Sequence, residues 1–222
     1  MKGVLFDLDG VITDTAKFHF KAWSKLAKDK LDVELPASFE TELKGVSRID
    51  SMVKILEFAG KKDDFSDDQI AQMAAEKNDF YLKEIDKLTK KDILPGIENL
   101  LDSLLANNIL LSVASASKNA PYILRKLGLY DSFDAIANPD NVAHGKPAPD
   151  IFIEAAKQIN VDPKDCVGLE DAVAGVQAIN DSGAVAVGIG DADELKDAAE
   201  VVPSTKDLSY MLLKETFDKY HE

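Results

Sequence analysis

From residue 92 onward, short apolar runs alternate with amphipathic segments, and this alternation constrains the fold more than any other feature. The apolar runs, together with a similar run near the N-terminus, predict strands. These are Gly3–Phe6, Ile109–Ala114, Phe133–Ala137, Cys166–Leu169, Val185–Ile189 and Glu200–Val202. The segments between predict helices at Ile97–Ala106, Pro121–Leu127, Asp150–Ile159, Ala172–Asp181 and Leu208–Tyr220, with C-terminal stops at Gly128 and Gly183. Such alternation is typical of a parallel sheet covered by helices on both faces.

Residues 14–90 interrupt this pattern with a charged, helical one. Apolar side chains recur there every three or four positions, as in Phe18, Ala22 and Leu26, Met52, Val53 and Leu56, and Ile70, Met73, Ala74, Phe80 and Tyr81. No strand is predicted in this segment. The sequence therefore predicts an α/β fold with a Rossmann-like, doubly wound parallel-sheet core in residues 1–13 and 91–222, and an inserted small helical cap in residues 14–90.

Composition limits the function classes. The 222 residues are 45% hydrophobic and 30% charged, which is typical of a soluble globular protein. A formal net charge of −14 argues against nucleic acid or anionic membrane partners. The N-terminus leads directly into a strand, with no signal peptide and no membrane-length apolar stretch, so we expect a cytoplasmic protein. The sole cysteine, Cys166, lies in an apolar run, which is typical of a small buried side chain. No exposed apolar stripe requires a partner subunit, so we expect a monomer.

Two carboxylates follow the first predicted strand. Asp7 and Asp9 are two residues apart, so in an extended chain they face the same side and could act on one reacting group. One could attack as a nucleophile while the other transfers a proton. Asp and Gly are also ordinary turn residues, so a strand followed by an acidic turn explains this segment equally well.

Polar residues follow the other strands as well. They are Ser115, Ala116, Ser117, Lys118 and Asn119 after the second strand, Lys146 in the loop after the third, and Glu170 and Asp171 after the fourth. Each group alone could be a helix cap, a solvated charge or a favourable charge at a helix N-terminus. Because parallel strands end at one edge of a sheet, their convergence there favours an active site.

Together these groups suit phosphoryl transfer. Asp7, Glu170, Asp171 and a backbone carbonyl near Asp9 offer the hard oxygen ligands that Mg²⁺ prefers. Ser115 can donate to a transferring phosphoryl group, and the ammonium of Lys146 can neutralise its charge. Attack by Asp7 would give an aspartyl phosphate.

The ordered set Asp7-Leu8-Asp9-Gly10, Ser115, Lys146 and Glu170-Asp171 resembles the haloacid dehalogenase superfamily of phosphotransferases. The resemblance implies that Asp7 is the phosphorylated nucleophile and Asp9 the general acid and base. It also implies that Ser115 and Lys146 hold the phosphoryl group, while the acidic pair helps to hold magnesium. The helical insert matches the members of the superfamily that carry a small helical lid.

The insert offers candidates for substrate recognition. Thr15, His19 and Trp23 recur at four-residue spacing, so they form one stripe of the first helix of the insert, which we expect to face the core. Packing at the domain seam explains His19 and Trp23 equally well. Arg48 follows a glycine-containing turn in a chain that otherwise uses lysine, apart from Arg125. Its planar guanidinium suits a second phosphate site.

These segments resemble the branch of the superfamily that interconverts glucose 1-phosphate and glucose 6-phosphate through a glucose 1,6-bisphosphate. The resemblance implies that Arg48, Ser117, Lys118 and Asn119 hold the non-transferring phosphate, and that Thr15 and His19 link cap closure to Asp9. The expected substrate-binding residues also include Trp23, Gly45, Val46, Ser47, Ser51 and Ala116. One departure is Ala172, where the resemblance implies serine; this puts only a minor hydrogen bond in doubt.

Two other functions remain open from the sequence. A sugar phosphate or phosphoglycolate-type phosphatase would share Asp7, Asp9, Ser115 and Lys146 but release the phosphate to water. Such an enzyme would not need the segments His19–Trp23 and Leu43–Arg48. A non-catalytic sugar phosphate sensor is disfavoured because every candidate catalytic group is present.

Overall fold

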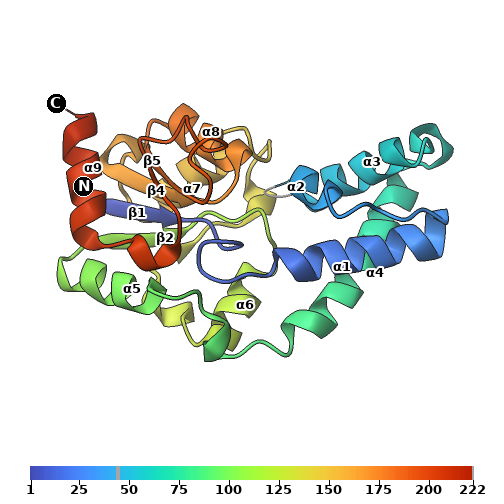
Figure 1. Ribbon diagram of the computed structural model, residues 1–222, viewed down its shortest axis with the longest axis horizontal. Coiled ribbons are helices and arrows are strands. Elements are labelled where there is room, and N and C mark those ends of the chain that lie inside the picture. The colour runs from blue at the N-terminus through green and yellow to red at the C-terminus, as the bar shows by residue number, and fades with distance from the viewer. Residues whose placement is uncertain (44–45, 222) are drawn as a thin grey trace. The chain divides into compact units, whose positions relative to one another are not determined.

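The computed structural model describes residues 1–43 and 46–221, and these divide into two compact units (Figure 1). The sheet unit comprises Met1–Asp14 with Thr89–Glu222, and the helical unit comprises Thr15–Leu88. The predicted site residue Gly45 lies outside the described residues.

Within the described residues, the sheet unit contains a six-stranded parallel sheet in the order β3-β2-β1-β4-β5-β6. The strands are β1 Gly3–Phe6, β2 Leu110–Val113, β3 Ala135–Ile136, β4 Cys166–Glu170, β5 Val185–Ile189 and β6 Glu200–Val202. Phe6 at the end of β1 is in register with Val113 of β2 and Leu169 of β4. The predicted doubly wound α/β fold is confirmed.

Helices cover the sheet on both sides. They are α5 Ile97–Ala106, α6 Ala120–Leu127, α7 Asp150–Gln158, α8 Val173–Ser182 and α9 Tyr210–Tyr220. Helices α7 and α8 pack on one face over a core that includes Leu5, Phe152 and Ile179, while α9, beside α5, lies against β4 and β5 (Figure 1). Gly128 and Gly183 end α6 and α8 in the left-handed conformation, as predicted.

Three predicted strands were given the wrong bounds. The run expected to pair over Ile109–Ala114 forms only β2, Leu110–Val113. The run expected to pair over Phe133–Ala137 forms only the two-residue β3, because the Asp134 side chain accepts a hydrogen bond from the Leu111 amide at 2.8 Å and replaces a backbone partner. Strand β4 continues through Glu170, which was expected to follow it, and Glu170 pairs in register with Gly188. The carboxylate of Glu170 is therefore held by the sheet.

The helical unit consists of α1 Ala16–Leu26, α2 Phe39–Leu43, α3 Arg48–Phe58 and α4 Asp67–Ile85, with a π-helical turn at Ala27–Leu31. Short 3₁₀ turns, in both units, lie at Lys62–Asp64, Lys90–Asp92, Tyr130–Ser132, Pro139–Asn141, Pro163–Asp165 and Thr205–Asp207. Helix α4 packs against α1 and α3 around a core that includes Leu26, Ile55 and Met73. None of the helices in the described ranges combines the length and the apolar character needed to cross a membrane.

Candidate active site

The candidate site of the sheet unit is built around Asp7, the first residue after the central strand β1. The Asp7 amide donates to the Leu169 carbonyl of β4 at 3.0 Å, and the Ala114 amide beyond β2 donates to the Phe6 carbonyl at 2.7 Å. Asp7 is only 5% exposed. The ends of three neighbouring strands therefore fix the backbone at Asp7.

Lys146 lies between two carboxylates. Its Nζ donates to Asp7 Oδ1 at 2.6 Å and to Glu170 Oε2 at 2.7 Å, and its side chain has no exposed area. The ammonium also lies 4.8 Å from the centre of the Phe152 ring of α7. The loop that carries Lys146 is tied to the start of α7, where Asp150 accepts a hydrogen bond from the His144 amide at 3.1 Å.

The electrostatics of this group follow from burial and mutual contact. Burial alone would disfavour the ammonium, but Asp7 and Glu170 outweigh it and raise the pKa of Lys146 above its usual range. Burial, and then the neighbouring Asp7 carboxylate, raise the pKa of Glu170 even though Lys146 opposes this. Lys146 therefore remains charged, and Glu170 is a carboxylate that additional positive charge would stabilise.

Asp7, Glu170 and Asp171 form a cluster that can hold a divalent metal ion. One carboxylate oxygen of each lies within 4.8 Å of the others. The second oxygen of Glu170, Oε1, accepts from the backbone amides of Asp171 and Ala172 at 3.2 Å, so both of its oxygens have fixed directions. A hard divalent cation suits such an all-oxygen donor set.

Two glycines, which have no side chain, provide room for the carboxylates of Glu170 and Asp171. A Cβ at Gly175 would lie 2.0 Å from Glu170 Oε2, and one at Gly10 would lie 2.1 Å from Asp171 Oδ2. Gly10 also has a φ of +81°, which favours glycine. The fit of the donor set therefore depends on the absence of two side chains, a requirement that the sequence analysis missed.

Asp9 is half-buried and precedes a tight turn over residues 10–13. The Gly10 amide donates to the Thr13 carbonyl at 2.8 Å, and the Thr13 hydroxyl donates to the Asp92 carbonyl at 2.7 Å. The Asp9 carboxylate is outside the cluster of described carboxylates that could share a metal. The sequence predicted that a backbone carbonyl near Asp9 binds the metal, and this stays a prediction.

The segment after β2 presents polar groups at the same sheet edge. Ser115 is 2% exposed, and its hydroxyl accepts from the Ser117 amide at 3.1 Å, while the Ser117 hydroxyl accepts from the Asn119 amide at 3.3 Å. The exposed ammonium of Lys118 contacts the carboxylate of Asp140. A phosphate bound by Lys118 would compete with Asp140, a residue that the sequence did not single out. Ala116 is half-buried.

Helix α1 carries the predicted stripe of the helical unit. Thr15 precedes the helix and is fully buried, and its Oγ1 has no hydrogen-bond partner among the described residues. Trp23 is only 2% exposed and belongs to the core of this unit. Packing therefore accounts for Trp23, and a role for it in binding sugar stays a prediction.

The segment around Arg48 forms the start of α3. Ser47 caps this helix, since its Oγ accepts from the Asp50 amide at 3.2 Å and donates to the Asp50 carboxylate at 2.6 Å. Arg48 is the first residue of the helix and is half-buried, as is Val46, whereas Ser51 is 2% exposed. The Ser47 hydroxyl thus has a structural role, and binding of substrate by this segment stays a prediction.

Sequence reasoning missed Lys77 of α4. It is 1% exposed, and its Nζ lies 2.7 Å from His19 Nδ1. Burial, and then the charges of Lys77 and Arg48, hold the pKa of His19 well below its usual range. The sequence could have predicted the burial of Lys77, because this residue follows Ile70 and Ala74 on the buried face at helical spacing.

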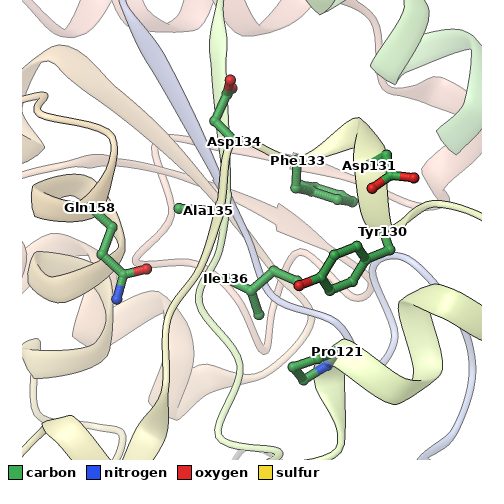
Figure 2. Close-up of a pocket in the computed structure, with 8 residues that line it drawn as sticks. All are labelled: Pro121, Tyr130, Asp131, Phe133, Asp134, Ala135, Ile136 and Gln158. Carbon is green, nitrogen blue, oxygen red and sulfur yellow. The ribbon is translucent and has the colours of Figure 1, made fainter.

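A separate pocket opens beside the edge strand β3 (Figure 2). The rings of Tyr130 and Phe133 and the side chains of Asp131 and Asp134 line it, together with Pro121, Ala135, Ile136 and Gln158. It contains none of the predicted site residues.

The model of the haloacid dehalogenase-like hydrolase family matches residues 1–183. The chain belongs to this family. It is 44% identical to beta-phosphoglucomutase of Bacillus subtilis (strain 168), covering 99% of this chain and 97% of that protein. The crystal structure of beta-phosphoglucomutase from Clostridium difficile matches with a TM-score of 0.97 and 46% identity, covering 100% of this chain and 99% of the other.

Phosphatases are also similar to this chain. Fructose-1-phosphate phosphatase YqaB of Escherichia coli (strain K12) is 31% identical, covering 84% of this chain and 95% of that protein. The haloacid dehalogenase family predicted from Asp7, Ser115, Lys146 and Glu170-Asp171 is therefore confirmed. The roles of these individual residues stay predictions.

Replacing Gly175 with alanine tests the metal cluster. The new methyl group would displace the Glu170 carboxylate, and we expect the affinity for a divalent cation to fall about tenfold or more. Isothermal titration calorimetry with MgCl₂ measures this. Val173→Ala is the matched control, because Val173 is 54% exposed in the same turn and should bind as the wild type. Unchanged affinity in Gly175→Ala would contradict the assignment.

His19 makes the stability of the helical unit depend on pH. Its pKa is below 6.5 in the folded protein, so below pH 6.5 the unfolded state binds the extra proton and the stabilising contribution is lost. At pH 5.5 this lowers the free energy of unfolding by up to about 1.4 kcal/mol relative to pH 7.5. Trp23, the sole tryptophan, reports urea unfolding of this unit.

We expect His19→Gln to lose this part of the pH dependence. His144→Gln is the control, because the side chain of His144 is 75% exposed, and it should keep the wild-type dependence. Equal pH dependence in the wild type and His19→Gln would show that His19 is not held neutral.

Proposed function

We propose that this protein interconverts beta-D-glucose 1-phosphate and glucose 6-phosphate through an aspartyl-phosphate enzyme and beta-glucose 1,6-bisphosphate. The observation that carries the proposal is the similarity to beta-phosphoglucomutase over 99% of the chain, which includes the helical unit as well as the sheet unit. The buried group of Asp7, Lys146 and Glu170 supports phosphoryl transfer as the reaction.

In the first half of the reaction, a carboxylate oxygen of Asp7 attacks the phosphorus atom of the bisphosphate. The bond from phosphorus to the sugar oxygen breaks, and Asp9, acting as an acid, gives that oxygen its proton. The ammonium of Lys146 and the hydroxyl of Ser115 stabilise the charge of the transferring group. The product is a glucose monophosphate with phospho-Asp7.

In the second half, the other glucose monophosphate places its free hydroxyl against phospho-Asp7. Asp9, now a carboxylate, takes the hydroxyl proton while the sugar oxygen bonds to phosphorus and the bond to Asp7 breaks. The bisphosphate forms again, and it reacts next through its other phosphate. This exchange requires a second phosphate site, for which Arg48, Ser117, Lys118 and Asn119 are the candidates.

Asp7, Glu170 and Asp171, with the backbone of Asp9, would hold Mg²⁺, which when bound supplies positive charge against the phosphate oxygens. The helical unit would serve as a cap that keeps water from phospho-Asp7, with Thr15 and His19 linking its closure to Asp9. Val46, Ser51, Trp23 and Gly45 would then line the sugar site. We also place the enzyme in the cytoplasm, because its proposed substrates are charged and do not cross bilayers unaided.

A phosphatase is the alternative, since a 31% identical relative is a fructose-1-phosphate phosphatase. In that case water, rather than a sugar hydroxyl, would accept the phosphoryl group from Asp7. The two functions share the chemistry of the first half-reaction and differ in what reaches phospho-Asp7.

The products distinguish these functions. We expect the protein, given Mg²⁺, beta-glucose 1-phosphate and a trace of beta-glucose 1,6-bisphosphate, to form glucose 6-phosphate with little free phosphate. Coupled dehydrogenase and phosphate assays on the same sample measure both products. Release of free phosphate as the main product would overturn the mutase in favour of the phosphatase.

Arg48→Ala tests the second phosphate site. We expect kcat/KM for beta-glucose 1-phosphate to fall about a hundredfold, because a charge-assisted, bidentate contact to phosphate is lost. Phosphorylation by acetyl phosphate, which has no second phosphate, should change little. Arg125→Ala is the control, since Arg125 stacks on Tyr130 at 3.7 Å in the sheet unit. Equal losses with beta-glucose 1-phosphate and with acetyl phosphate would count against the second site.

A further inference from the structure

An ammonium group lies in the interior of the helical unit. Lys77 is on the buried face of α4, which also carries Ile70, Ala74 and Tyr81. Only 1% of Lys77 is exposed, so its charge has lost almost all contact with water. Burial of an ammonium is costly unless nearby groups replace its hydration. The surroundings of Lys77 are therefore under a strong chemical constraint.

Aromatic faces surround this ammonium. Its Nζ lies 4.6 Å from the centre of the Trp23 ring and 4.8 Å from that of Tyr81, and both rings are buried. The electron-rich face of an aromatic ring attracts a cation, most strongly where water is excluded. The aromatic cage, Trp23 of α1 and Tyr81 of α4, thus replaces part of the lost hydration.

Tyr81 also contacts His19, the hydrogen-bond partner of Lys77. The rings of His19 and Tyr81 have their centres 3.9 Å apart and are tilted by 37°, while Lys77 Nζ lies 2.7 Å from His19 Nδ1. Tyr81 therefore touches both partners of this hydrogen bond. Displacement of its ring would release the ammonium and the imidazole together.

We propose that Tyr81, with Trp23, is a positioning residue that holds the Lys77 ammonium against His19 Nδ1 and so fixes the proton of the neutral imidazole on Nε2. An ammonium has three donors and no acceptor, so the nitrogen facing it must accept. A neutral imidazole then carries its proton on the other nitrogen. The lowered pKa of His19 agrees with a neutral ring.

This arrangement gives His19 one direction of hydrogen bonding: Nε2 can only donate. The consequence for catalysis rests on the proposed function, in which His19 assists Asp9. A ring held as a donor can orient the carboxylate form of Asp9, whereas the other tautomer would present a lone pair and repel it. Tyr81 would then affect turnover without touching substrate.

Nitrogen NMR of the uniformly ¹⁵N-labelled protein tests the tautomer directly, and with three histidines in the chain the assignment is tractable. We expect wild-type His19 at pH 7.5 to show the pattern of an Nε2–H tautomer. The Hε protons of Lys77 should be shifted upfield by the ring currents of Trp23 and Tyr81. An Nδ1–H tautomer, or unshifted Lys77 protons, would overturn the proposal whether or not any variant folds.

Variants separate positioning from simple packing. Tyr81→Phe keeps the ring and should retain the Nε2–H tautomer, while Tyr81→Leu should give a mixture of tautomers and lower kcat about 5- to 30-fold with little change in KM. Phe80→Leu is the matched control on the same helix. The half-buried ring of Phe80 lies 4.9 Å from the ammonium of Lys25, and its replacement should alter neither quantity.

The outcomes distinguish this proposal from the proposed function. The expected NMR pattern in a protein without mutase activity would support the cage and reject the mutase. Mutase activity with unchanged tautomer and kcat in Tyr81→Leu would reject the cage alone.

Discussion

The ammonium of Lys146 lies between the carboxylates of Asp7 and Glu170, which come from the neighbouring strands β1 and β4, and the site of the sheet unit depends on this contact. Without it, two buried carboxylates would face each other across two paired strands. Removing one partner of such a buried group typically costs about 3–5 kcal/mol. The same contact leaves Glu170 oxygens with fixed directions and keeps a positive charge beside Asp7, so stability and chemistry have one origin.

The order of the strands explains why these groups meet. The central strand β1 has β2 and β4 as neighbours, and the polar segments that follow or end these three strands carry Asp7, Ser115 and Glu170. Lys146 lies in the loop before α7. Phe152 of that helix packs in the core against the sheet and contacts the Lys146 ammonium. Residues distant in sequence are therefore brought together by parallel pairing and by the helix that covers it.

Much of this arrangement could be predicted from the sequence. Gly3–Phe6 and Val185–Ile189 were predicted with the observed bounds, because continuous apolar runs between polar turns are typical of buried strands. The edge strand β3 was predicted too long, since the Asp134 side chain supplies a bond that no pattern of hydrophobicity reveals. The alternative that Lys146 is merely a solvated loop charge is wrong, because its side chain has no exposed area.

The features that the sequence did not reveal depend on three-dimensional contact. Gly175 and Gly10 matter because of atoms that approach them, and Lys77 matters because it is buried among aromatic rings. A lysine in a charged helix normally indicates a solvated face, and only its position on the buried stripe suggested otherwise. Trp23, whose predicted role in binding sugar stays a prediction, packs in the core of the helical unit and contacts Lys77.

The central claim is that the end of β1 accepts a phosphoryl group. The most direct measurement is to phosphorylate the protein with acetyl phosphate and Mg²⁺, trap the acyl phosphate with borohydride, and locate the reduced residue by mass spectrometry. The account predicts modification of Asp7 in the wild type and none in Asp7→Asn. Modification of another residue, or equal labelling of Asp7→Asn, would contradict it.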